Sequence, residues 1–324
     1  MNPRALILGV TGQDGSYLAE ILLEKGYEVH GLIRRSATGN TKNIEHIIDK
    51  ITVHRGDLAD TTSLYRAISR AKPQEIYNEA DQDHVSWSYD LVEYACDITG
   101  AAVGRILEII RQVDPKIRFF QPLSSNIFGK VDKDLIDEET PFRPQSPYAA
   151  AKVLALTLCR YYREVFGIFS ATGIFFNHES PRRTTEYVTR KITMAAARIS
   201  KGLQDKLYLG NLDAKLDFGY AKEYMEAATK ILQLDKPDDF NICTGEVHSV
   251  REFLEEVFAY VGLDPDDYVE FDPRFARPSS TGVLRGDNSK AKKVFGFEPS
   301  VRFKELVRIM VDHDLKLLDM KSGK

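Results

Sequence analysis

Cysteine is scarce in this sequence. The three cysteines, Cys96, Cys159 and Cys243, lie far apart among 324 residues and share no paired spacing. Such a distribution indicates neither a disulfide framework nor a zinc site, because both usually bring cysteines close together in pairs. We therefore expect no metal centre and a reducing, cytoplasmic location.

Long apolar runs and a basic excess are also missing. The first apolar run, Ala5 to Val10, is short, and no later run approaches the roughly 18 apolar residues of a membrane span. The formal net charge is -4, whereas binding to nucleic acid by phosphate neutralisation needs clustered positive charge. We therefore expect no membrane or nucleic-acid partner, and a small molecule as ligand.

Short β-rich segments alternate with helical ones through the first half of the chain. The strand-like segments are Arg4–Leu8, Glu28–Ile33, Ile51–His54, Glu75–Asn78, Arg118–Pro122 and Phe169–Phe175. This alternation predicts an α/β fold with a doubly wound parallel sheet of the Rossmann type. Pro147–Phe166 is predicted to form a helix with its proline in the first turn, where the missing N–H costs nothing.

After about Asn177 the pattern becomes looser. Helical stretches at Val188–Lys201, Ala221–Leu232, Val250–Val261 and Phe303–Leu318 stand among Gly, Pro and Asp turns. We expect a Rossmann domain over residues 1–176, with returning segments near 212–248, and a smaller mixed α/β lobe mainly over residues 177–324. A ligand would lie in the cleft between two such lobes.

A glycine turn follows the first predicted strand and opens the first predicted helix. Its residues are Gly9, Val10, Thr11, Gly12, Gln13, Asp14 and Gly15, a GxxGxxG spacing. In this context the glycines form a tight turn and admit a pyrophosphate, and the helix N-terminus supplies N–H donors. The turn predicts a dinucleotide cofactor.

The residues after the second strand favour one dinucleotide. NAD enzymes place an acid there, whereas this chain has Arg34, Arg35 and Ser36. Two guanidinium groups suit a 2′-phosphate and favour NADP, although paired arginines can also form a solvated loop. Asp57 and Leu58, after the third strand, are predicted to flank the adenine.

Tyr148 and Lys152 stand four residues apart on the helix after the fifth strand. This spacing puts both side chains on one face. A nearby ammonium favours the phenolate, so we expect Lys152 to lower the pKa of Tyr148 from its usual value of about 10. The phenolate would accept a proton from a sugar hydroxyl as hydride leaves the same carbon.

Ser124, Ser125 and Asn126 end the fifth strand, where an open α/β sheet delivers side chains to its ligand. Either serine hydroxyl could hydrogen-bond the reacting oxygen. Alternatively, a polar strand end can simply cap the next turn.

Several segments together closely resemble GDP-mannose 4,6-dehydratases. They read GVTGQDGSYLAEILLEKGYEVHGLIRRS, SPYAAAK, GIFFNHESPRR, VTRKI, LGNLDAK and TGEVHSVREF, and the similarity runs nearly end to end. The resemblance implies an extended short-chain dehydrogenase that binds NADP tightly and acts on GDP-mannose as a homodimer or homotetramer. It makes Tyr148, Lys152 and Ser124 catalytic.

The resemblance also implies positions for the ligands. His178 and Arg183 match positions at the cofactor. The positions implied at the GDP-sugar are Asp83, Asn177, Val188, Lys191, Leu209, Gly210, Asn211, Leu216, Arg277 and Ser280. Among them, Leu216 and Ser280 stand where the family has, respectively, an arginine and a glutamate.

A third departure concerns catalysis. The family reads Thr-Ser-Glu where this chain reads Ser124, Ser125 and Asn126, and that glutamate removes the C5 proton and expels the C6 hydroxyl. An amide does not ionise in the useful range, so Asn126 leaves elimination without its acid–base group. Oxidation at C4 would survive this change.

Acids also enter a stretch that is neutral in the family, at Glu79, Asp81 and Asp83. They could supply a relocated acid–base group, pair with a differently substituted sugar, or face solvent. The predicted function is NADP-dependent hydride transfer at C4 of a GDP-hexose. Dehydration, 4-keto reduction, C4 oxidation and epimerisation remain open, as does a non-catalytic protein that binds NADP and a GDP-sugar.

Overall fold

The computed structural model describes residues 2–34, 36, 39–275 and 282–322. Its central element is a seven-stranded parallel sheet in the order β11-β6-β5-β4-β1-β2-β3. The strands are β1 (Arg4–Leu8), β2 (Glu28–Ile33), β3 (Thr52–Arg55), β4 (Glu75–Asn78), β5 (Arg118–Ser124), β6 (Ser170–Phe175) and β11 (Asp239–Ile242). The order reverses between β1 and β4, which confirms the predicted doubly wound sheet.

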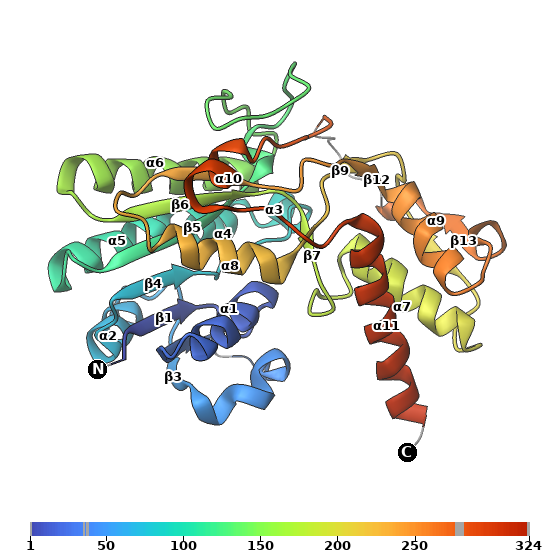
Figure 1. The fold of residues 1–324 in the computed structure, drawn as a ribbon, viewed down its shortest axis with the longest axis horizontal. Helices are drawn as coiled ribbons and strands as arrows, with labels where there is room; N and C mark the ends of the chain where they lie inside the picture. The colour runs from blue at the N-terminus through green and yellow to red at the C-terminus, as the bar shows by residue number, and fades with distance from the viewer. Residues whose placement is uncertain (1, 35, 37–38, 276–281, 323–324) are drawn as a thin grey trace.

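Helices cover both faces of this sheet (Figure 1). One layer contains α2 (Thr61–Ala71), α5 (Ala102–Val113) and α6 (Pro147–Phe166), and the other contains α1 (Gln13–Glu24), α8 (Ala221–Ile231) and α10 (Ser289–Phe295). Because helices pack on both faces, every strand except the edge strand β3 is buried along most of its length. The segments α8, β11 and α10 return to the sheet from the second half of the chain.

Helix α6 has the predicted bounds, and local chemistry explains them. Ser146 caps the helix by accepting a hydrogen bond from the Ala149 N–H over 3.1 Å, and Pro147 fills the first turn. Gly167 ends it with φ +67°, a left-handed conformation that glycine adopts without steric cost. Helix α1 begins at Gln13 with Gly12 as its N-cap, so its first turn lies within the glycine turn, as the sequence predicted.

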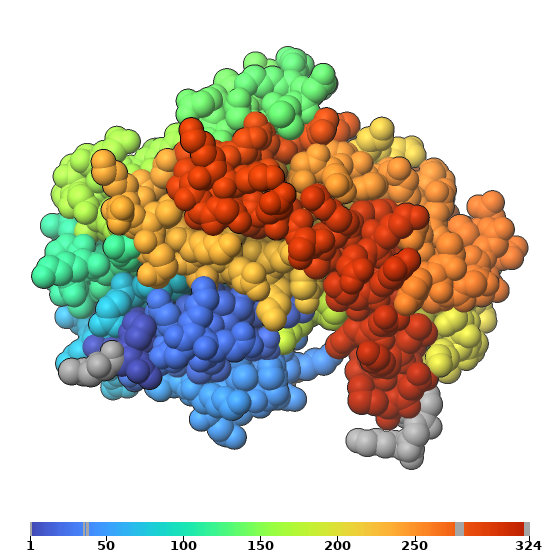
Figure 2. All heavy atoms as spheres, viewed as in Figure 1, coloured from blue at the N-terminus to red at the C-terminus, as the bar shows by residue number. Residues whose placement is uncertain are grey.

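The smaller lobe is built on three helices, α7 (Val188–Ser200), α9 (Val250–Tyr260) and α11 (Phe303–Ser322), with their own apolar core. Short strand pairs accompany them: β8 (Leu207–Leu209) with β13 (Val269–Phe271), and β9 (Lys215–Leu216) with β12 (His248–Ser249). A further parallel pair consists of β7 (His178–Glu179), which comes soon after β6 in the chain, and β10 (Gly219–Tyr220). Figure 1 shows this lobe beside one end of the sheet, and in Figure 2 its yellow, orange and red atoms form the right-hand side of the molecule.

Short helical turns complete the described part of the chain. They are α3 (Trp87–Asp90), α4 (Val92–Ala95), η1 (Lys42–Lys50), the π-helical η2 (Cys96–Ala101), η3 (Ser125–Ile127), η4 (Pro265–Asp267) and η5 (Pro273–Phe275). Within the described ranges, none of the helices is long and apolar enough to cross a membrane.

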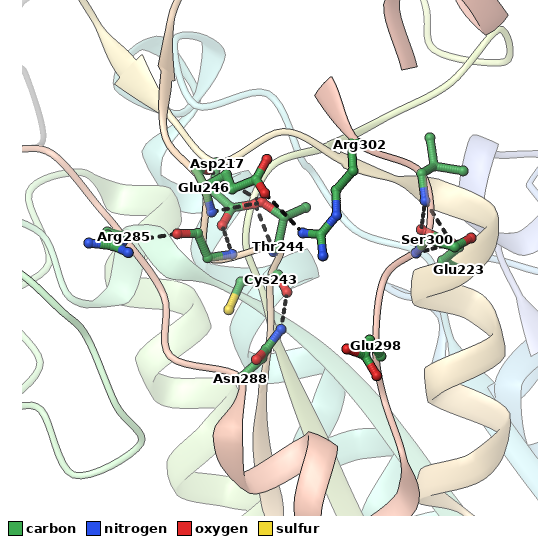
Figure 3. Close-up of polar contacts among 12 residues, drawn as sticks. Asp217, Glu223, Cys243, Thr244, Glu246, Arg285, Asn288, Glu298, Ser300 and Arg302 are labelled. Atoms are coloured by element: carbon green, nitrogen blue, oxygen red, sulfur yellow. Dashed lines mark hydrogen bonds and ion pairs between the residues drawn. The ribbon is translucent and has the colours of Figure 1, made fainter. Parts of the chain in front are cut away.

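A buried carboxylate joins segments that connect the sheet to the smaller lobe (Figure 3). Asp217, between β9 and β10, accepts hydrogen bonds from the Thr244 N–H over 3.0 Å, the Thr244 hydroxyl over 2.8 Å and the Gly245 N–H over 2.8 Å. Thr244 and Gly245 lie in the turn after β11, which ends at Ile242. Nearby, Arg302 pairs with Glu246 at 3.2 Å, so three separate stretches of chain meet at this joint.

Candidate active site

A cavity of about 460 Å³ runs along the carboxyl ends of β1 to β6. It crosses the point between β1 and β4 where the strand order reverses, which is where open α/β sheets bind ligands. The predicted site residues in its wall are Gly9, Thr11, Gly12, Gln13, Asp14, Arg34, Asp57, Leu58, Asp83, Ser124, Asn126, Tyr148, Lys152, Asn177, His178 and Arg183. The fold therefore brings together residues from both halves of the chain.

The glycine turn forms the floor of this cavity. Gly9 has φ +83°, and a Cβ there would lie 2.6 Å from the carbonyl oxygen of Glu79. A Cβ at Gly15 would collide with the backbone of Gly9, so this glycine lets α1 approach the turn. A Cβ at Gly12 would meet only the Gly9 oxygen, at 3.4 Å, which leaves room for an anion at the N-terminus of α1.

Arg34 lies at the end of the cavity beside β2 and β3. Its Nη1 donates a hydrogen bond to the Tyr94 hydroxyl over 2.6 Å. Asn43 also lines this end and donates to the carbonyl oxygen of Thr11 over 3.1 Å. Arg35 lies outside the described residues, and Ser36 is not in the cavity wall.

The segment after β6 is attached to α1 by buried polar contacts. Nε2 of His178 lies 3.0 Å from Oδ2 of Asp14, and the Ser180 hydroxyl donates to Oε1 of Gln13 over 2.7 Å. Burial acts against both charges of the first pair, but their mutual attraction outweighs it. The pKa of Asp14 is therefore lowered and that of His178 raised. Asp14 and His178, both predicted at the cofactor, thus hold the segment after β6 against α1.

Tyr148 and Lys152 face the cavity from α6. Nζ of Lys152 donates to the carbonyl oxygen of Pro122 over 2.9 Å and lies 2.6 Å from Oδ2 of Asp81. Burial raises the pKa of Tyr148 to about 12, and the carboxylates of Asp81 and Asp83 add to this effect, which Lys152 opposes. Lys152 does act to lower the phenol pKa, as expected, but burial and two acids outweigh the single ammonium, so the expectation of a phenolate near neutral pH is wrong.

The three residues at the end of β5, beside Tyr148, differ in their access to the cavity. Ser124 lines the cavity, and its hydrogen bond to Tyr148 lowers the phenol pKa. Nδ2 of Asn126 donates to Oγ of Ser124 over 3.0 Å. Ser125 is buried and is absent from the cavity wall, although it was predicted as a catalytic residue. Of the two serine hydroxyls, only that of Ser124 reaches the cavity.

The three acids after β4 have different surroundings. Burial raises the pKa of Glu79 well above its ordinary value, and burial also raises that of Asp81. Asp83 is half-exposed and lies 3.8 Å from Nη1 of Arg183. Glu79 and Asp81 therefore do not face bulk solvent, and Asp81 already has a cationic partner in Lys152.

Most of the residues predicted at the GDP-sugar lie elsewhere. Val188, Leu209, Gly210, Asn211 and Leu216 do not line the main cavity. Leu209 is part of the apolar core of the smaller lobe, against which Leu216 packs. Arg277 and Ser280 lie outside the described residues.

Lys191 lines a second cavity, of about 450 Å³. It donates to the carbonyl oxygen of Tyr208 over 2.6 Å and lies 3.4 Å from the ring centre of Phe275. The adjacent residues Thr184 and Thr185 line the first and the second cavity respectively. The two cavities thus share one connecting segment.

Several cavity residues were not predicted as site residues. Tyr187 places its ring 3.5 Å from the guanidinium carbon of Arg183, and Tyr94 and Asn43 approach the glycine turn region from short helical turns. No periodic pattern distinguishes these residues in the sequence. The acids Glu79 and Asp81 did give a signal, because charged side chains directly after a buried strand face the ligand crevice.

The fold and the cavity define an enzyme class. A glycine turn after β1 at the switch point of a doubly wound sheet defines a dinucleotide-binding enzyme class, and the Tyr–Lys pair on the helix after β5 faces the same cavity. Residues 6–310 match the family described as GDP-mannose 4,6 dehydratase. The chain belongs to the GDP-mannose 4,6-dehydratase family, as the sequence predicted, and is by this membership an enzyme.

Individual relatives agree over almost their whole length. The chain is 50% identical to GDP-mannose 4,6 dehydratase 2 of Arabidopsis thaliana, covering 97% of this chain and 87% of the relative. It is 45% identical to human GDP-mannose 4,6 dehydratase, covering 97% and 92%. The structure of Thermus thermophilus UDP-glucose 4-epimerase in complex with NAD has a TM-score of 0.85 at 28% identity, covering 96% and 98%.

Proposed function

We propose that this chain binds NADP in the cavity and catalyses reversible hydride transfer at C4 of a GDP-hexose. The observation that carries this proposal is the position of Tyr148, Lys152 and Ser124 in one wall of a cavity whose floor is the glycine turn. The membership in a nucleotide-sugar family and the NAD bound to the Thermus thermophilus neighbour support it.

The residues present fit a dinucleotide. The open space at Gly12 and the N-terminus of α1 suit a pyrophosphate, and Arg34 would meet a 2′-phosphate at the far end. His178 and Arg183 line the cavity beside the turn, where each is paired with an acid. NADP supplies a hydride acceptor, or a donor in its reduced form. Tyr148 would exchange the proton of the C4 oxygen, and Ser124 would hydrogen-bond the same oxygen.

The sugar nucleotide would extend from this wall toward the smaller lobe. Asn177 and Asp83 lie in the main cavity, and Lys191 lies in the second cavity beyond Thr184 and Thr185. A diphosphate near Lys191 would gain a charge-assisted contact. We further propose that the enzyme works as a homodimer or homotetramer.

The identity of Asn126 bears on the product. Its amide donates to Ser124 and has no ionisable proton to exchange with C5 or the C6 oxygen. We therefore favour oxidation or reduction at C4 over loss of water.

Incubation of the purified protein with NADP, or with NADPH, and GDP-mannose or its 4-keto derivatives tests this function. We expect nicotinamide absorbance to change with wild type and not with Tyr148→Phe, which removes only the reacting hydroxyl. Cofactor binding by the variant, followed by fluorescence, serves as the control. Binding without turnover in every combination would favour the non-catalytic binding protein and overturn the proposal.

A further inference from the structure

Asp81 holds the catalytic ammonium group in a defined place. Its Oδ2 lies 2.6 Å from Nζ of Lys152, whose side chain is 4% exposed, against 15% for Asp81. The same Nζ donates to the Pro122 carbonyl oxygen over 2.9 Å. Two of the three N–H donors of Lys152 are thus engaged, and neither of these partners is the phenol of Tyr148.

This contact changes what Lys152 does to its neighbour. An ammonium favours a phenolate through its positive charge. A carboxylate at ion-pair distance cancels most of that charge for any group farther away, because the two fields oppose each other. Nζ of Lys152 lies 5.7 Å from the ring centre of Tyr148, so the phenol faces a nearly neutral pair and not a free cation.

The other charged groups described here do not supply an unpaired positive charge to the phenol. From the segment after β4, Asp83 adds negative charge, and Glu79 faces Lys152. Arg183, from the segment after β6, is itself paired with Glu179 at 3.6 Å and Asp83 at 3.8 Å, and Tyr187 packs on it. Asp14 on α1 is paired with His178. Ser124 is the group that favours the phenolate by a hydrogen bond.

We propose that Asp81 is a positioning residue that acts through Lys152, so that Tyr148 enters the reaction carrying its proton and the site works near neutral pH as a reductase of GDP-4-keto-hexoses. The proposal rests on the hydride transfer proposed above and adds its direction and substrate. The high pKa of Tyr148 agrees with it.

The reductive step balances with the groups present. The carbonyl carbon at C4 accepts a hydride from NADPH as the C=O double bond becomes single, and the carbonyl oxygen accepts the proton from Oη of Tyr148. The products are the C4 alcohol, NADP and a phenolate, which regains its proton from water. The Asn126 amide needs no charge in this step, whereas elimination requires one.

The pH dependence of the two directions tests the proposal. NADPH oxidation with GDP-4-keto-6-deoxymannose and NADP reduction with the corresponding C4 alcohol are followed for wild type, Asp81→Asn, Asp81→Glu and Asp83→Asn. For wild type we expect reduction at neutral pH and oxidation of the alcohol only in alkaline solution. In Asp81→Asn the oxidation profile should move toward neutrality by about one pH unit or more.

Two further variants distinguish the contact between Asp81 and Lys152 from the general effect of negative charge in this segment. Asp81→Glu keeps the carboxylate and should retain most of the wild-type profile. Asp83→Asn also removes one negative charge from the segment after β4, but Asp83 does not contact Lys152. The pH profile of alcohol oxidation should therefore move less in this variant. An unchanged profile for Asp81→Asn, or equal movement for Asp81→Asn and Asp83→Asn, would show that the Lys152 contact is not the cause.

A measurement without turnover distinguishes this proposal from the proposed function. The Cζ resonance of Tyr148 in protein labelled with ¹³C-tyrosine, assigned by its absence in Tyr148→Phe, reports phenol ionisation directly. We expect it to titrate at lower pH in Asp81→Asn than in wild type. A titration moved in this way without any hydride transfer would overturn the enzymatic function alone, whereas hydride transfer with an unmoved titration would overturn the role of Asp81.

Discussion

Nδ2 of Asn126 donates a hydrogen bond to Oγ of Ser124 over 3.0 Å. The amide thus orients the hydroxyl that neighbours the Tyr148 phenol, but it offers no group that can take up and return a proton at C5 and C6. The same position carries a glutamate in the family that the sequence resembles. We therefore expect this difference to determine which product the enzyme makes.

We predict that wild type converts GDP-mannose to the 4-keto-6-deoxy product very slowly or not at all. Asn126→Glu should raise the rate of water loss by about 10²- to 10⁴-fold, the usual contribution of general acid–base catalysis. Mass spectrometry of the products measures this gain. The control is Asn126→Gln, because glutamine is as long as glutamate but does not ionise. Substantial water loss by wild type would contradict the prediction and direct attention to Asp81 and Asp83.

Arg34 at the β2 end of the cavity predicts a preference for NADP over NAD. The double change Arg34→Ala with Arg35→Ala should weaken NADP binding by about 1.5–3 kcal/mol, or one to two decades, because a charge-assisted phosphate contact is lost. NAD binding should change little. Fluorescence titrations compare the two cofactors, and Arg66→Ala with Arg70→Ala, at two exposed positions on α2, controls for the loss of two positive charges. Identical wild-type curves for NAD and NADP would exclude the preference.

Asp217 predicts a pH-dependent stability. Burial raises its pKa from 3.8 to about 6, against the effect of its three hydrogen bonds. The native state therefore binds the proton more tightly than the unfolded state. This contribution is fully present below pH 3.8 and is lost as the pH rises through about 6. The loss should amount to about 3 kcal/mol in the free energy of unfolding.

Urea denaturation at several pH values measures this slope. In Asp217→Asn the slope between these two pKa values should be smaller than in wild type, whatever the constant cost of the altered hydrogen bonds. Asp213→Asn, with a side chain 79% exposed, should keep the wild-type slope. Parallel slopes for wild type and Asp217→Asn would assign the pH dependence to other groups.

Arg190 on α7 and Asp314 on α11 form an ion pair that is buried almost completely, with side chains 4% and 0% exposed. Asp314→Ala should lower the free energy of unfolding by about 3–5 kcal/mol, because it leaves an uncompensated charge in the core. The pair Arg190→Met with Asp314→Leu should be much closer to wild type. Urea midpoints compare the variants, and equal losses in both would show that packing, not charge, determines the cost.

The sequence was sufficient for features that depend on local chemistry. The GxxGxxG turn after β1 and the helix Pro147–Phe166 were predicted because glycine and proline impose conformations within a few residues. The doubly wound sheet followed from the regular alternation of strands and helices. The Tyr148 and Lys152 spacing placed both side chains on one helix face without knowledge of the rest.

The tertiary structure decided what these residues can do. The pairing of Lys152 with Asp81 joins segments far apart in the sequence, and the pKa of Tyr148 depends on burial and on several charges that only the folded chain brings together. For the same reason the sequence could not show that Asp217 anchors the turn after β11. Spacing along the chain fixes local neighbours, but electrostatic effects depend on distances through space, which only the packed structure determines.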